Sequence, residues 1–345
     1  MNPLMSLLYL QCFTVALLLS AVLTPLMRKI ALHFGILDHP ISDVKTHTKS
    51  TPYLGGIAVA TAFTVSLLGA RIMTSFPTGT LRSLRGILCG GLIILLLGLA
   101  DDIHPHGLGY KKKFIGQFAA ALCLLFFDIR IKFIQPVWFA DLITLFWIVG
   151  VTNALNIIDI MDGLASGIGV IACFGFLFIS LPSEEIYVNF TAAALAGGLL
   201  GFIPYNMSKK LKIFMGDTGS LVTGFSLAAL SLGTSYTRVT RMGVFAPILI
   251  LGLPIYDTLL VTYLRLMKGM SPFLGSRDHF ALRLESFGFF REEILVISYA
   301  ISLLLTFVAY KVTMVPSAYA VALYSLAGVV AVGLGTWLAR ISIEP

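Results

Sequence analysis

Apolar residues dominate long segments spread over the whole chain, and short polar stretches separate these segments from one another. Eleven such segments lie near residues 4–27, 53–75, 84–100, 114–134, 137–158, 164–181, 188–205, 219–235, 242–266, 294–314 and 317–339. A helix needs about 20 apolar residues to cross the hydrocarbon core of a bilayer, and each segment is close to that length. The pattern therefore predicts an all-α, polytopic membrane bundle of about eleven transmembrane helices, with residues 1–345 in a single domain.

The composition favours a membrane protein over a soluble one. Hydrophobic residues make up 57% of the chain and charged residues only 12%, which is more apolar surface than a water-soluble fold can bury. The net charge of +7 does not indicate nucleic-acid binding, because the basic residues lie in short loops between apolar segments. A lipid bilayer is the expected partner, no nucleic acid is expected, and a homodimer remains open.

Basic residues in the loops indicate the orientation in the membrane. Arg28 and Lys29 follow the first apolar segment, which places the N-terminus outside and, after eleven crossings, the C-terminus in the cytoplasm. Sixteen of the 24 Lys and Arg residues then face the cytoplasm, the exceptions being Arg71, Arg82, Arg85, Arg130, Lys132, Arg238, Arg241 and Lys311. The predicted cytoplasmic loops lie near residues 28–52, 101–113, 159–163, 206–218 and 267–293. All of the candidate functional residues lie in these loops or next to them. We expect a multi-pass protein of the plasma (inner) membrane with a cytoplasmic active site.

Two adjacent carboxylates, Asp101 and Asp102, end one apolar segment. Such a pair is costly at a membrane edge unless it is solvated or bound, and it forms a hard-oxygen site for a divalent cation. A charged helix end in the headgroup zone is the alternative. Lys111, Lys112 and Lys113 follow on the next segment, where they can meet phosphate charge or simply obey the positive-inside rule.

Polar residues recur every three positions in the series Asn153-x-x-Asn156-x-x-Asp159-x-x-Asp162-Gly163. Side chains three residues apart are neighbours on a helix, but the whole series would turn halfway round a straight one. We therefore predict that the helix ends or bends around residues 159–163, which brings the series toward one site. Asn and Asp side chains supply the oxygen and amide groups that such a site needs.

The string Phe214-Met215-Gly216-Asp217-Thr218-Gly219-Ser220 opens a later apolar segment. Asp217 or Thr218 can cap that helix, and a glycine-rich helix start also suits phosphate. Asp217 can instead complete a metal site with the other acids. Asn206, just upstream, is a candidate contact for a base or sugar.

The polar loop from residue 265 to 283 contains Arg277, His279 and Arg283. Arginine can hold a diphosphate through two parallel hydrogen bonds, so these residues are candidates for phosphate binding. An ordinary basic loop at the membrane surface is the alternative.

Four motifs of the chain, three of them described above, occur in the same order in one known family. They are Thr51-Pro52-x-x-Gly55-Gly56, Asp101-Asp102, the series from Asn153 to Gly163, and the string from Phe214 to Ser220. On these residues the chain resembles the polyprenyl-phosphate N-acetylhexosamine-1-phosphate transferases from about His39 to Arg283.

The resemblance implies transfer of a sugar 1-phosphate from a UDP-sugar to polyprenyl phosphate, an initiating step of cell-surface glycan synthesis that releases UMP. N-acetylglucosamine or a related N-acetylhexosamine is the expected sugar, and Mg²⁺ is the expected cofactor, with Mn²⁺ as a substitute. Together with the residue chemistry above, it gives three predicted groups: Asp101, Asp102, Asp159 and Asp162 as catalytic residues; Asp217, Asp102 and Asp159 as metal ligands; and Lys113, Asn153, Asn156, Asn206, Arg277, His279 and Arg283 as substrate-binding residues.

The sequence departs from the family pattern at two points. Asp159-Ile160-Met161-Asp162-Gly163 stands where many members have Asp-Gly-x-Asp-Gly. Only His279 remains of a His-x-His-His cluster, with Ala281 and Leu282 at its later positions. The chain is thus less similar to the phospho-N-acetylmuramoyl-pentapeptide translocase branch than to the bacterial N-acetylglucosamine-1-phosphate transferases.

A multi-pass secondary transporter that uses intramembrane acids is the alternative function. Transporters commonly place such acids at broken helices near the middle of the membrane. Here the acids lie at the ends of segments on one side, which favours the enzyme.

Overall fold

The computed structural model describes residues 3–39, 50–104, 107–237, 239–273 and 275–341. Parts of three predicted loops, residues 40–49, 105–106 and 274, lie outside the described residues. The helices and strands are α1 (Pro3–Phe34), β1 (Leu37–Asp38), β2 (Thr51–Pro52), α2 (Gly55–Met73), α3 (Thr78–Ile103), α4 (Tyr110–Phe126), α5 (Val137–Ile157), α6 (Leu164–Ser180), the short 3-10 helix η1 (Leu181–Ser183), α7 (Ile186–Asn206), α8 (Gly216–Gly233), η2 (Arg241–Phe245), α9 (Ala246–Ile250), α10 (Gly252–Met267), α11 (Phe280–Phe287), α12 (Arg291–Val312) and α13 (Ser317–Ala339). The protein is therefore almost entirely helical, as predicted.

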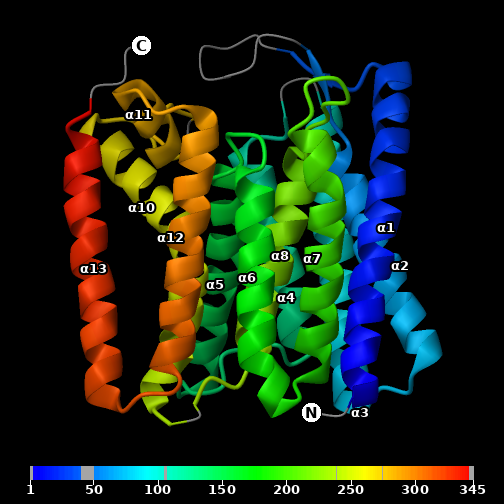
Figure 1. Cartoon of the computed structure of the whole chain (residues 1–345), viewed down its shortest axis with the longest axis vertical. Coiled ribbons are helices and arrows are strands. Elements are labelled where there is room, and N and C mark those ends of the chain that lie inside the picture. The colour runs from blue at the N-terminus through cyan, green and yellow to red at the C-terminus, as the bar shows by residue number, and fades with distance from the viewer. Residues whose placement is uncertain (1–2, 40–49, 105–106, 238, 274, 342–345) are drawn as a thin grey trace.

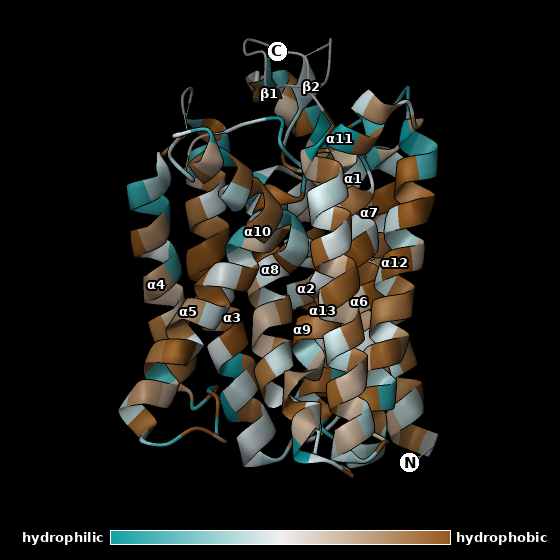
Figure 2. Ribbon diagram, turned by 90° about the vertical axis from the view of Figure 1, so that its left-hand side faces the viewer, coloured by the Kyte–Doolittle hydropathy of each residue, from teal (hydrophilic) through white to brown (hydrophobic). Residues whose placement is uncertain are grey.

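Most of these helices run side by side along one direction (Figure 1), and each predicted apolar segment contains at least one of them. Figure 2 shows apolar residues over the middle of the bundle and polar residues gathered at its two ends. The start of α1 and the end of α13 lie at opposite ends of the bundle (Figure 1).

Eight helices among the described residues are long and apolar enough to cross a membrane. A bent pair, Arg241–Ile250 with Gly252–Met267, makes nine if it is counted as one span. Helices α4 and α8 run alongside the others in Figure 1 but are not among these candidates. The structure thus supports a multi-pass membrane protein with eight or nine spans, and the predicted count of eleven is not established by it.

Two predicted segments differ from the helices that form. The segment near 242–266 is broken by a bend of 69°, and Pro254 in the first turn of α10 has no N–H to donate to the Ile250 carbonyl. The segment near 114–134 is helical only from Tyr110 to Phe126. Beyond it, Arg130 donates to Asp141 at 2.7 Å and to the Leu125 carbonyl at 3.1 Å, which holds the following residues in a loop.

Helix α8 lies at the centre of the bundle, and every residue from Thr218 to Ser231 is buried. By contrast, only Ala320 and Leu338 are buried in α13, whose apolar side chains would face lipid. Close backbone approach holds α8 in place, since a Cβ atom on Gly56 of α2 would lie 2.1 Å from the Gly219 nitrogen.

A short hairpin lies beside the start of α8, with β1 and β2 antiparallel and Leu37 opposite Pro52. The residues after β2 continue this backbone pairing with the residues before α8. Phe214 N–H donates to the Pro52 carbonyl at 2.9 Å, Gly55 N–H to the Phe214 carbonyl at 3.0 Å, and Gly56 N–H to the Met215 carbonyl at 2.9 Å. The hairpin and the start of α8 are therefore joined as one unit.

Candidate active site

Candidate residues from several motifs meet at one end of the bundle, the end where α11 lies in Figure 1. A cavity of about 280 Å³ opens there. It is lined by six of the predicted site residues: Asn156, Asp159, Asp162, Asn206, Asp217 and His279. Helix ends that are distant in sequence thus contribute to one polar cavity.

The connection between α5 and α6 carries two of these acids. Helix α5 ends at Ile157 and α6 begins at Leu164, which confirms the predicted break in the Asn/Asp series. Gly163 makes the turn with a φ of +81°, a conformation that favours glycine. Its N–H donates to Asn206 Oδ1 at 2.7 Å, and its carbonyl accepts from the Tyr299 hydroxyl at 2.7 Å. The turn is fixed from both sides and directs Asp159 and Asp162 into the cavity.

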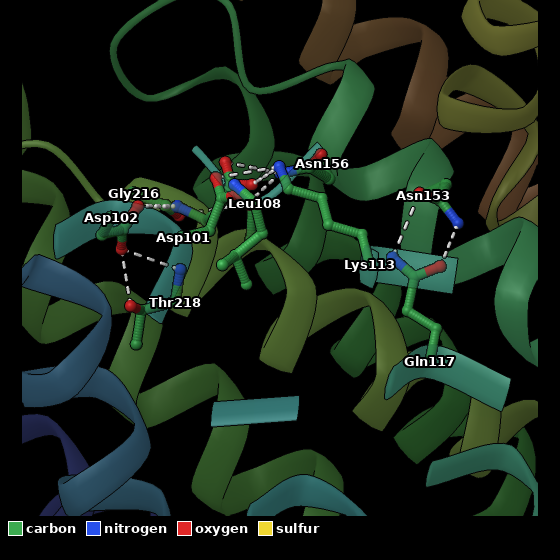
Figure 3. Close-up of polar contacts among 11 residues, drawn as sticks. Asp101, Asp102, Leu108, Lys113, Gln117, Asn153, Asn156, Gly216 and Thr218 are labelled. Carbon is green, nitrogen blue, oxygen red and sulfur yellow. Dashed lines mark hydrogen bonds and ion pairs between the residues drawn. The ribbon is translucent and has the colours of Figure 1, made fainter. Parts of the chain in front are cut away.

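Asp217, in the first turn of α8, is bound on both carboxylate oxygens. Asn156 donates to Oδ1 at 3.1 Å, and Lys113 forms an ion pair with Oδ2. The Lys113 ammonium also lies 2.9 Å from Asp101 Oδ2, and Asp101 Oδ1 accepts the Leu108 N–H at 2.7 Å. Figure 3 shows the Lys113 side chain extended toward Asp101 and Asn156. Lys113 of α4 therefore links two of the predicted acids, Asp101 of α3 and Asp217 of α8.

Asp102 accepts hydrogen bonds from the start of α8. Its Oδ1 accepts the Asp217 N–H at 2.8 Å, and its Oδ2 accepts the Thr218 N–H at 3.0 Å and the Thr218 hydroxyl at 2.5 Å (Figure 3). These are the unpaired donors at the start of α8, so Asp102 caps a helix to which it does not belong. Gly98 allows this contact, because a Cβ there would lie 2.5 Å from Thr218 Cα. Asp102 is not among the residues that line the cavity, and it supplies the cap that the sequence assigned to Asp217 or Thr218.

Asn153 does not reach the cavity. It lies one turn before Asn156 on α5, where its amide donates to Gln117 Oε1 at 2.7 Å and accepts from Gln117 Nε2 at 3.2 Å. Figure 3 shows this pair apart from the Lys113 cluster. The reciprocal amide pair joins α4 to α5, so the structure does not support the predicted contact of Asn153 with substrate.

Asn206 and Asp162 reach the cavity but have protein partners. Asn206 is 5% exposed and donates to the Ile213 carbonyl at 3.1 Å in addition to accepting from Gly163. It therefore braces two loops at the cavity wall. Asp162 pairs with Lys212 at 2.6 Å, and the Lys212 ammonium lies 5.1 Å from the Phe214 ring centre. Lys212 is a cavity cation that the sequence reasoning did not single out.

The loop that follows α10 is fixed by buried charges. Asp278 is 2% exposed and accepts from Lys268 at 2.7 Å and from Arg283 Nη2 at 2.6 Å. Arg283 also donates to the carbonyls of Leu338 and Ile341, at 3.0 and 2.7 Å. Its guanidinium is thus used to tie α11 to the end of α13 and does not face the cavity, contrary to the prediction.

Arg277 and His279, the other predicted phosphate-binding residues of this loop, differ in position. Arg277 is not among the residues that line the cavity. Its Nε is buried and has no hydrogen-bond partner within the described part of the chain. His279 lines the cavity, and its Nδ1 lies 2.8 Å from Asp257 Oδ2. Asp257 was missed in the sequence, although a single acid inside an apolar segment is a signal of function.

The cavity carries excess negative charge. Burial and, to a smaller extent, the neighbouring carboxylates of Asp217, Asp162 and Asp102 together raise the pKa of Asp159 to about 8. No described residue donates a hydrogen bond to the Asp159 carboxylate. The carboxylate is therefore costly to ionise until a cation approaches it.

The acids fit a divalent cation in part. Across the described ranges, no three Asp, Glu, His or Cys side chains are close enough to chelate an ion by themselves. Mg²⁺, however, is usually held by one or two carboxylates, with waters and substrate phosphates completing its shell. Asp217 and Asp159, beside the Asn156 amide, line one cavity and fit such a site, whereas Asp102 does not line that cavity.

Known proteins of similar sequence are transferases of sugar phosphates. Residues 84–235 match glycosyl transferase family 4. A probable undecaprenyl-phosphate N-acetylglucosaminyl 1-phosphate transferase of Bacillus subtilis is 34% identical over 295 residues, 83% of this chain and 80% of the relative. The phospho-N-acetylmuramoyl-pentapeptide-transferase of Listeria monocytogenes serotype 4b (strain CLIP80459) is 35% identical over 247 residues, 64% of this chain and 73% of the relative. That of Limosilactobacillus reuteri (strain DSM 20016) is 36% identical over 198 residues, 53% of this chain and 60% of the relative.

The helical bundle and the acidic cavity at its end, taken together with these relatives, identify a polytopic membrane enzyme of the sugar-phosphate transferase class. Within that class, the chain belongs to glycosyl transferase family 4, together with the polyprenyl-phosphate sugar-1-phosphate transferases. The predicted family resemblance is confirmed. The relative named for N-acetylglucosamine aligns with more of the chain than the pentapeptide transferases do, and the transporter alternative gains no support.

Proposed function

We propose that the protein transfers N-acetylglucosamine 1-phosphate, or a related N-acetylhexosamine 1-phosphate, from its UDP-sugar to a polyprenyl phosphate. The products are a polyprenyl-diphosphate sugar and UMP. The observation that carries this proposal is that Asp217, Asp159 and Asn156, from two separate motifs, line one cavity at an end of the bundle. A lipid phosphate and a water-soluble nucleotide sugar can meet only at such a membrane edge.

We place this cavity on the cytoplasmic side of the plasma (inner) membrane, with eleven crossings, the N-terminus outside and the C-terminus inside. The opposite ends of the bundle at which α1 starts and α13 ends fit an odd number of crossings (Figure 1). The basic residues in the loops at the cavity end favour the cytoplasm for that end.

Magnesium, or manganese in its place, would be held by Asp217 and Asp159. When bound, the ion supplies positive charge that offsets the charge of the diphosphate. The rest of the work falls to residues of the chain. His279 and Lys212 line the cavity as groups able to bind phosphate oxygens, and Lys113 fixes Asp217 from the side.

The reaction forms one bond and breaks one. An oxygen of the lipid phosphate bonds to the sugar-linked phosphorus, and the bond from that phosphorus to the oxygen of UMP breaks. No general base is required, because a phosphate monoester with a second pKa of about 6 is already mostly dianionic at neutral pH. Asp101 remains the candidate if a base or a covalent nucleophile takes part.

The test is incubation of the purified protein with polyprenyl phosphate and a panel of UDP-sugars, with UMP release as the measurement. We expect UMP release that requires the lipid and is fastest with UDP-N-acetylglucosamine or a related UDP-N-acetylhexosamine. Absence of lipid-dependent UMP release with every UDP-sugar would refute the proposed function.

A further inference from the structure

Asp257 is a buried carboxylate with two partners on the same short segment. It lies on α10, is 0% exposed, and accepts the Phe280 N–H on Oδ1 at 2.8 Å. Its Oδ2 lies 2.8 Å from His279 Nδ1. Both contacts act at the start of α11, so Asp257 fixes the backbone and the imidazole of adjacent residues.

The contact determines which nitrogen of His279 is used. A carboxylate accepts hydrogen bonds, so Nδ1 carries the proton that Asp257 binds. Nε2 is the remaining nitrogen, and no described residue makes a hydrogen bond to it. His279 is 5% exposed and lines the cavity, so a ligand in the cavity is the partner that its Nε2 can meet.

The imidazole of His279 lies between Asp257 and the cavity. The cavity end of His279 faces the space into which an anionic diphosphate would enter, and Asp257 sits behind the ring. A histidine with a proton on each ring nitrogen can donate from Nδ1 to Asp257 and from Nε2 to a phosphate oxygen.

We propose that Asp257 is a positioning residue that holds His279 with Nε2 directed at the diphosphate of the sugar donor. This inference rests on the proposed function and adds a residue to its site. Asp257 itself does not touch the substrate and acts through His279.

Three substitutions separate this role from a structural one. Asp257→Asn keeps an acceptor for the Phe280 N–H but removes the carboxylate behind the ring. His279→Asn keeps an N–H near the position of Nδ1, so the contact with Asp257 can persist while Nε2 is lost. His279→Gln places its N–H near Nε2 and should restore part of the donor binding.

The experiment measures KM for the UDP-sugar, KM for the lipid and kcat in the four proteins of the cycle: wild type, Asp257→Asn, His279→Asn and the double variant. We expect each single change to raise KM for the UDP-sugar by roughly 10- to 100-fold, the effect of one hydrogen bond to a charged group. KM for the lipid should stay unchanged. The double variant should be no worse than His279→Asn, because Asp257 has nothing left to position.

A matched control is Asp141→Asn, which removes an ion pair with Arg130 (2.7 Å) and should leave both KM values unchanged. Asp141 lies near the start of α5, whereas the cavity residue Asn156 lies at the other end of that helix. The inference would be overturned if the double variant multiplied the increases in KM for the UDP-sugar of the two single variants, or if Asp257→Asn left that KM unchanged. In either case, lipid-dependent UMP release by the wild type would still support the proposed function. If Asp257→Asn does not fold, the inference is tested with His279→Asn and His279→Gln alone. Equal KM values for the UDP-sugar in the wild type and His279→Asn would then reject the inference. A wild type without lipid-dependent UMP release or UDP binding would overturn both proposals.

Discussion

Asp102 and Asp217 are in direct contact and give a pair of isosteric variants with opposite expected effects. Asp102→Asn keeps the size of the side chain but replaces one carboxylate oxygen by an amide NH₂ group. The remaining oxygen can accept from Asp217 N–H or from Thr218 N–H, which the carboxylate now binds at 2.8 and 3.0 Å, but it cannot serve both positions. One backbone N–H at the start of a buried helix then loses its acceptor.

The expected loss of stability follows from these contacts. An unsatisfied buried donor costs about 1–3 kcal/mol. Removal of a negative charge from a helix N-terminus costs a further 0.3–1 kcal/mol, roughly. We therefore expect Asp102→Asn to lower the free energy of unfolding by about 1–4 kcal/mol, seen as a fall of several degrees in Tm in detergent.

Asp217→Asn should have the opposite pattern, with stability kept and turnover lost. The α8 cap comes from Asp102, so the cap and Tm should persist, whereas the loss of an anionic ligand should lower UMP release by orders of magnitude at limiting Mg²⁺. Thermal unfolding and UMP release are measured on both variants under the same conditions. A stable but inactive Asp102→Asn would refute the capping argument, and near-wild-type turnover of Asp217→Asn would reject its role as a metal ligand.

Three further predictions address the metal, the topology and pH. A chelator should abolish UMP release and added Mg²⁺ should restore it; full turnover in excess chelator would remove the metal from the proposal. A cysteine at Ser208, which is part-exposed at the cavity end, should be labelled in opened membranes but not from outside intact cells, and external labelling would reverse the orientation. Burial raises the pKa of Asp278, but hydrogen bonds from Lys268 and Arg283 outweigh it and leave the pKa below its ordinary value. Its stabilising effect is thus present above about pH 4 and is lost as the pH falls through the lowered pKa, so Asp278→Asn should flatten the dependence of Tm on acid pH, and parallel curves would contradict this.

The helical bundle and the meeting of the motifs could be predicted because both follow from local patterns. Apolar length determines where helices form, and the three-residue spacing of the Asn/Asp series required a break that α5 and α6 show. The bend before α10 was missed, since Pro254 lies inside an apolar segment that reads as continuous.

The use of individual polar groups could not be predicted in the same way. Asn153 and Arg283 have the residue types of a phosphate or sugar site, but Gln117 and the end of α13 already use their donors. Spacing along a chain does not tell which donors are occupied by residues far away in sequence. Asp257 could have been suspected from its apolar surroundings, but its partner His279 follows only from the fold.

The backbone pairing of Pro52, Gly55 and Gly56 with Phe214 and Met215 has a consequence for biogenesis. The hairpin side of this pairing leaves the ribosome long before the other side has been synthesised. Until α8 enters the membrane, the early segment keeps unpaired peptide groups at the bilayer surface, where water can solvate them. The site is therefore completed late in insertion, and a nascent chain stopped before residue 214 would carry the hairpin without its partner.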